Sequence, residues 1–116
     1  MLYFVTETIY FILSSINYMK IKDIPWYNRP GIRLKRKGVK VLSDAELFAI
    51  VLGRGDKKEN AVDMSNRLLK KYNFLGLSGL SFKELKKESK DQVKAMKILA
   101  MFELFRRINK IFNRNF

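Results

Sequence analysis

Serine followed three residues later by glutamate occurs twice in this 116-residue chain, each time where a helical pattern begins. Ser43 precedes Glu46, and Ser81 precedes Glu84. In such a pair the serine hydroxyl accepts a hydrogen bond from the glutamate N–H, and the glutamate carboxylate accepts one from the serine N–H. Residues 89–92, Ser-Lys-Asp-Gln, give a third start signal. These signals predict a chain built from several capped helices.

The signals between these starts complete an all-α prediction. Pro30 suits the first turn of a short helix over residues 31–37, which Gly38 would close. Asn60 is expected to start another helix, and residues 73–79 form a turn-rich connection. No segment alternates apolar and polar residues as a strand would. We therefore predict a small helical bundle of helix-hairpin-helix type with about five helices.

The longest helix is predicted over residues 92–112, because apolar residues recur there at spacings of three and four. The run that follows Glu46 is too apolar for a surface helix, so we expect it to be buried. On this basis residues 19–112 form one helical domain, followed by a basic tail over residues 113–116. The predicted core consists of Leu47, Ile50, Val51, Leu68, Leu85, Met96, Ala100, Leu104 and Ile108.

The charge balance is strongly basic: 24 lysines and arginines face 11 aspartates and glutamates, for a net charge of +13. Such an excess favours a polyanionic partner, although it also serves solubility. The chain has no cysteine and no histidine, so these residues supply no disulfide, thiol nucleophile, zinc finger or zinc protease site. We expect a cytoplasmic protein that is not an enzyme and uses neither a cofactor nor a metal.

Residues 1–18 are apolar and carry a single charged side chain, Glu7. They lack the basic start of a signal peptide and are shorter than a membrane-spanning helix. Three interpretations are open: an amphipathic arm packed on the domain, a membrane-facing appendage, or translation that truly starts at Met19. We favour a start at Met19. Residues 1–18 would then not be part of the native protein, and a membrane partner is disfavoured.

A series of motifs in order along the chain carries a family resemblance. Lys22-Asp23-Ile24-Pro25 and Arg29-Pro30 come first, and the stretches 42–50, LSDAELFAI, and 53–55, GRG, follow. Val93-Lys94-Ala95 and residues 100–107 close the series. Over residues 19–108 the chain resembles the N-terminal helix-hairpin-helix domain of RadC-family proteins. Members usually continue into a domain that resembles JAB/MPN metalloproteases, and that activity is not carried over to this chain.

The resemblance implies DNA binding, but the motif that would carry it is altered. A helix-hairpin-helix turn of the type Gly-hydrophobic-Gly exposes backbone N–H groups to a DNA phosphate at the start of the second helix. Here the matching region, residues 88–92, has no glycine and is one residue shorter. Asp91 would also place a negative charge where the phosphate should lie.

Three groups of basic residues remain as candidate phosphate contacts. One lies within residues 29–40, a second is the row of lysines at 90, 94 and 97, and a third is the row Arg106, Lys110 and Arg114. We predict sequence-nonspecific binding to the DNA backbone. The alternative is a protein-interaction or regulatory remnant that has lost DNA binding. The predicted nucleic-acid-binding residues are Arg33, Arg36, Lys37, Lys90, Lys94 and Lys97.

Three further patterns have simpler explanations than a chemical site. Residues 53–56, GRGD, lack the Lys-Ser/Thr ending of a phosphate loop, so we interpret them as a helix terminator. Asp44, Glu46 and Glu59 could be imagined as a metal cluster, but helix capping explains the first two better. Trp26-Tyr27 could stack on an unpaired base, yet covering the core is the favoured role.

Overall fold

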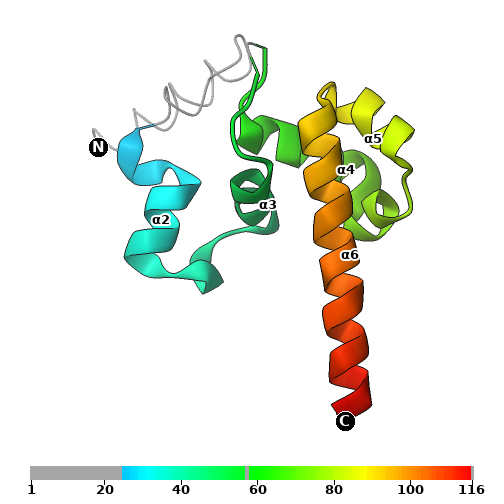
Figure 1. Cartoon of the computed structure of the whole chain (residues 1–116). Coiled ribbons are helices and arrows are strands. Elements are labelled where there is room, and N and C mark those ends of the chain that lie inside the picture. Colours follow the sequence, from blue (N-terminus) through cyan, green and yellow to red (C-terminus); the bar gives the residue numbers. More distant parts are fainter. Residues whose placement is uncertain (1–24, 57, 116) are drawn as a thin grey trace. The chain divides into compact units, whose positions relative to one another are not determined.

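The computed structural model describes residues 25–56 and 58–115, and the chain divides into two compact units, residues 1–65 and 66–116. The described residues contain five α-helices, two short 3-10 helices and no strand (Figure 1). The all-α prediction is therefore confirmed. The elements are η2 (Trp26–Asn28), α2 (Pro30–Lys37), η3 (Val39–Val41), α3 (Asp44–Leu52), α4 (Ala61–Ser78), α5 (Phe82–Ser89) and α6 (Gln92–Asn115).

The predicted helix starts are confirmed in atomic detail. Glu46 N donates to Ser43 Oγ over 3.2 Å, and Ser43 N donates to Glu46 Oε1 over 3.1 Å. Ser81 and Glu84 make the same reciprocal pair at the start of α5. Asn60 begins α4, since its Oδ1 accepts from the backbone N–H of the third residue on, over 2.7 Å. Each pair satisfies N–H groups that a helix start would otherwise leave without a partner.

In the first unit α2 packs against α3. Phe48, Ala49 and Leu52 are buried at the three- and four-residue spacing of a single helix face. The prediction that Ile50 and Val51 belong to the core is wrong, because each is 38% exposed. A nine-residue helix that packs through one face leaves its remaining apolar side chains partly in water. Leu47, also predicted as core, is half-buried.

In the second unit α5 packs along α6. Leu68 and Leu85 are fully buried, so these two predicted core positions are confirmed. Leu77, Ala95 and Ile98 complete the buried apolar set of this unit. The core of the second unit thus gathers at the N-terminal half of α6.

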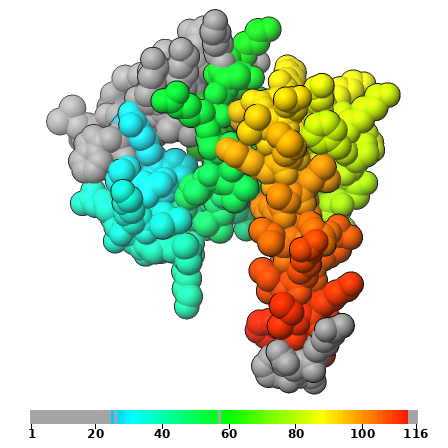
Figure 2. Space-filling view, viewed as in Figure 1, coloured from blue at the N-terminus to red at the C-terminus, as the bar shows by residue number. Residues whose placement is uncertain are grey.

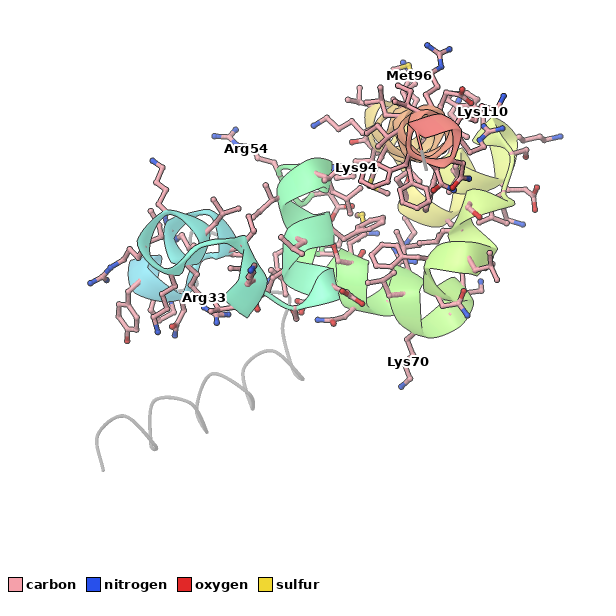
Figure 3. All side chains as sticks on the ribbon, turned by 90° about the horizontal axis from the view of Figure 1, so that it is seen from below. Arg33, Arg54, Lys70, Lys94, Met96 and Lys110 are labelled. Atoms are coloured by element: carbon pink, nitrogen blue, oxygen red, sulfur yellow. The ribbon has the colours of Figure 1, made fainter. Side chains whose placement is uncertain are left out.

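The predicted inward face of α6 is wrong. Met96, Ala100, Leu104 and Ile108 are exposed, and Figure 3 shows Met96 pointing away from the helix bundle. The buried residues of α6 are at positions 94, 95 and 98. Successive residues are about 100° apart around a helix axis, so the predicted core positions of α6 lie on nearly the opposite side of the helix from the buried positions 94, 95 and 98. Apolar residues recur at helical spacing on both sides of α6, and α5 covers only one.

Residues 73–79, expected as a turn-rich connection, contain a break at Asn73 (φ 52°, ψ 177°), after which a helical turn continues to Ser78. Asn73 Oδ1 accepts from Gly76 N over 2.8 Å and so caps that new turn. The extension over residues 1–18 and the side chain of Trp26 lie outside what the structure describes.

Candidate nucleic-acid interface

The basic residues of α2 are not equivalent. Arg33 forms an ion pair with Glu46 of α3, and both side chains are more than two-thirds buried. This pair ties α2 to α3, so the guanidinium is already engaged. Arg36 and Lys37 are exposed on the last turn of α2. Of the three residues predicted here, these two are therefore the ones exposed to solvent.

The hairpin between α5 and α6 turns at a lysine. Lys90 adopts the left-handed conformation (φ 60°, ψ 23°), and its N–H donates to the Lys86 carbonyl over 2.8 Å. A left-handed backbone favours glycine, because a side chain there costs about 1–2 kcal/mol. The lysine thus occupies a backbone position that suits glycine, and its exposed side chain adds a positive charge.

Asp91 occupies the start of α6 where a helix-hairpin-helix turn would present amides to a phosphate. Its Oδ1 accepts from Val93 N over 2.8 Å and from Lys94 N over 3.2 Å. Its Oδ2 accepts from Lys94 Nζ over 3.2 Å. The Lys94 hydrogen bond is the main reason that the pKa of the Asp91 carboxyl lies below its ordinary value. The carboxylate therefore stays ionised at neutral pH and takes the amides for itself.

The lysines at 90, 94 and 97 differ in their exposure to solvent. Lys94 is 6% exposed, and its ammonium is held by Asp91. Its stem lies on the same helix face as Ala95 and Ile98, which pack in the core. Lys90 and Lys97 are exposed.

The loop between α3 and α4 is closed by its own backbone. A Cβ on Gly55 would lie 2.3 Å from the Glu59 carbonyl oxygen, so the chain approaches itself too closely for any side chain. Asp56 Oδ1 accepts from the N–H groups of Lys58 and Glu59, each over 2.8 Å. Gly53 ends α3 with φ 82°, and its N–H donates to the Ala49 carbonyl. The helix-terminator interpretation is confirmed.

Within the described ranges, no three acidic side chains gather as metal ligands would. The capping role expected for Glu46 is confirmed, and Glu59 lends its backbone carbonyl to the loop that precedes α4. Among the described residues no helix is both long and apolar enough to cross a membrane.

Comparison of the sequence with known proteins identifies the family of this helical chain. The sequence profile of the UPF0758 N-terminal family matches residues 21–98. The chain belongs to the UPF0758 family. The RadC-family resemblance is thereby confirmed, since UPF0758 proteins are related to RadC.

Curated UPF0758 relatives come from distant organisms. The chain is 47% identical over 93 residues to UPF0758 protein CA_C1241 of Clostridium acetobutylicum, which covers 78% of this chain and 41% of the relative. It is 44% identical over 98 residues to a UPF0758 protein of Chlorobaculum parvum, covering 84% and 44% respectively. A UPF0758 protein of Methanosarcina acetivorans is 40% identical over 95 residues. The chain thus spans less than half the length of these relatives, and no solved structure matches it.

The UPF0758 domain carries a basic surface that the sequence analysis missed. Lys83, Lys86 and Lys87 are all exposed on α5. At about 100° per residue they fall within a sector of roughly 100°, and Lys90 continues the same sector at the end of the helix. We call these four residues the α5 lysine face. Their spacing of three and four was visible in the sequence and could have identified them.

The acidic residues of α5 do not neutralise the α5 lysine face, because other groups engage them. Glu84 caps the start of its own helix. Glu88 accepts from Tyr72 Oη over 2.8 Å and from Lys71 Nζ over 3.1 Å, and these bonds, the Tyr72 bond above all, lower the pKa of its carboxyl. Arg67 is also held there, through the Glu88 carbonyl oxygen. The α5 lysine face makes no ion pair within the described part of the chain.

Proposed function

We propose that this UPF0758 domain binds DNA without sequence preference, through backbone phosphates that contact the α5 lysine face. The supporting observation is the arrangement of Lys83, Lys86, Lys87 and Lys90, which are exposed on one side of α5 and pair with no carboxylate of the residues that the structure describes. Four ammonium groups so close together repel one another, and a polyanion relieves that repulsion. Lysine contacts phosphate as a point charge and reads no base, so binding is insensitive to sequence.

The proposal differs from the usual helix-hairpin-helix contact in which backbone amides hold the phosphate. Asp91 already accepts from the two amides at the start of α6. A phosphate would have to displace this carboxylate or approach it against charge repulsion. Side-chain ammonium groups beside the hairpin meet no such obstacle. The charge of Lys90 at the turn therefore takes over part of the role that hairpin amides have in other domains.

Arg36, Lys37 and Lys97 are secondary candidates in this proposal. All three are exposed, but Arg36 and Lys97 also take part in other interactions within the chain. Arg33 and Lys94 are engaged by Glu46 and Asp91. We therefore expect these last two to contribute little to phosphate binding.

The test is the salt dependence of affinity for a labelled duplex of about 20 base pairs, followed by fluorescence anisotropy. Each neutralised phosphate contributes a slope of about −0.9 in log affinity against log salt. Four contacts predict a slope near −3.6 and a weakening of roughly a hundredfold between about 50 and 200 mM salt. Changing Lys83, Lys86 and Lys87 together to alanine is expected to reduce the slope by about 2.7, equally for unrelated sequences.

The matched control changes Lys58, Lys70 and Lys110 to alanine. These are exposed lysines from separate parts of the chain, and Figure 3 shows Lys70 and Lys110 pointing outward. The control removes the same charge but leaves the α5 lysine face intact. An equal loss of slope in both triple variants would show that only net charge matters and would contradict the assigned surface. Absence of binding at about 50 mM salt would overturn DNA binding and favour the protein-interaction alternative.

A further inference from the structure

The C-terminal half of α6 extends beyond the helices that cover its beginning. Lys94, Ala95 and Ile98 are buried, whereas every side chain described from Leu104 to Asn113 is exposed. Within the second unit, Figure 1 shows this part of α6 running clear of α5. Figure 2 shows no α5 side chains against its orange-to-red end on the visible face.

This exposed half is divided into an apolar and a charged side. Five large apolar side chains are between 56% and 64% exposed, and at about 100° per residue they share a sector of roughly 120°. The charged side chains lie on the opposite side, where Glu103 pairs with both Arg106 and Arg107. We call the five residues the α6 apolar face: Leu104, Phe105, Ile108, Ile111 and Phe112.

The exposed area of the α6 apolar face is large for a helix left in water. Taking about 150–250 Å² for an aromatic side chain and somewhat less for an aliphatic one, the five residues expose on the order of 500 Å². Patches of this size on soluble proteins usually mark an interaction site. If two such faces covered each other, the pair would bury roughly 1,000 Å², which is near the lower bound for a specific interface.

We propose that the α6 apolar face pairs with the same face of a second copy of this chain, with the two helices antiparallel. The face contains no polar group that needs a particular partner, so it complements itself across a two-fold axis. The charged sector points away from such an interface and stays in water. An antiparallel pair also keeps the two α5 helices, with their exposed lysines, at opposite ends. The two helices cross near Ile108, the middle of the face.

A lipid surface is the main competing occupant, since amphipathic helices with basic sides bind membranes. Two of the three cations described on the charged side, Arg106 and Arg107, are paired with Glu103, which leaves little free charge for anionic headgroups. The observations therefore favour the second copy.

The first test is sedimentation equilibrium of the whole chain from about 1 to 200 μM. We expect a monomer–dimer equilibrium with a dissociation constant in the micromolar range, as suits an interface of this size. Ile108→Glu should weaken association at least tenfold and leave the helical circular dichroism unchanged, because residue 108 lies outside the core. Lys110→Gln changes the net charge by the same amount on the opposite side and should associate like the wild type.

The second test fixes the orientation, using the absence of cysteine from the chain. In an antiparallel pair that crosses at residue 108, Ile108→Cys should form a disulfide with its copy, whereas Phe112→Cys should not. Crosslinking of both variants would indicate parallel helices and overturn the stated geometry. A monomer over the whole concentration range would overturn the proposal. So would vesicle binding that Ile108→Glu abolishes in a chain that remains monomeric without lipid.

Discussion

The loop between α3 and α4 and the loop between α5 and α6 meet the same requirements with different residues. Each must reverse the chain after a helix through a backbone with positive φ. The first loop uses Gly53 at φ 82°, and the second uses Lys90 at φ 60°. Glycine adopts such angles without cost, whereas lysine adopts them with strain but contributes a charge. The first loop is built for close backbone packing and the second presents a cation.

In both loops an aspartate side chain accepts hydrogen bonds from nearby backbone N–H groups. Asp56 accepts from two amides in the first loop, and Asp91 accepts from two at the start of α6. In neither loop are these amides open to an outside anion. At these two loops a phosphate contact would therefore have to come from side chains. Among the described residues, only the second loop adjoins a row of lysines that makes no ion pair.

Gly55→Ala should break the first loop and cause the largest loss of stability. The added Cβ would lie 2.3 Å from the Glu59 carbonyl oxygen and 2.4 Å from Asn60 Cα, and backbone atoms cannot give way as a flexible side chain can. We expect a destabilisation of about 3 kcal/mol or more, measured by urea unfolding.

Gly31→Ala is the control for that change. A Cβ at position 31 meets nothing within 4 Å, and the residue lies in the first turn of α2. Alanine there should stabilise by about 0.5–1 kcal/mol. Similar losses from both substitutions would contradict the close approach of backbone in the first loop.

Asp91→Ala should break the second loop with a smaller loss. The change removes the cap of α6 and leaves the buried Lys94 ammonium without its partner. Loss of a cap costs about 1 kcal/mol, and the ion pair adds modestly because the Asp91 side chain is 38% exposed. We expect a total of about 1–3 kcal/mol by urea unfolding.

The double variant Asp91→Ala with Lys94→Met separates the two contributions. Methionine fills a similar volume without a charge to bury, so the double variant should recover the part of the loss that comes from the unpaired ammonium. If the double variant is less stable than Asp91→Ala alone, Lys94 contributes to stability by other means than this ion pair.

The sequence predicted helix starts well because a capping box is local: four residues contain both partners. Packing is not local. Val93, Met96 and Ala100 recur at helical spacing just as Ala95 and Ile98 do, and only the position of α5 decides which set is buried. When apolar residues recur at helical spacing on both faces of a helix, the spacing alone does not indicate which face is buried.

The candidate site was predicted only in part for a related reason. Spacing alone places Lys90, Lys94 and Lys97 in one row, and it does not show that Lys94 is buried whereas Lys90 is exposed. Asp91, three residues before Lys94, was the sequence sign that this lysine had a partner. Lys86 and Lys87 of the α5 lysine face were missed although their spacing is equally regular.

Lys90→Gly should make the second loop resemble the first and has the smallest expected effect. At φ 60° the lysine backbone is strained, and glycine removes that strain while it adds freedom to the unfolded chain. The net gain in unfolding free energy should be about 0.5–1 kcal/mol, measured with urea near pH 7. Lys90→Ala removes the same charge but keeps a Cβ at the strained position, so it should gain almost nothing. The glycine variant should therefore exceed the alanine variant by about 1 kcal/mol, and equal stability of the two would show that Lys90 affects stability through its charge rather than its backbone.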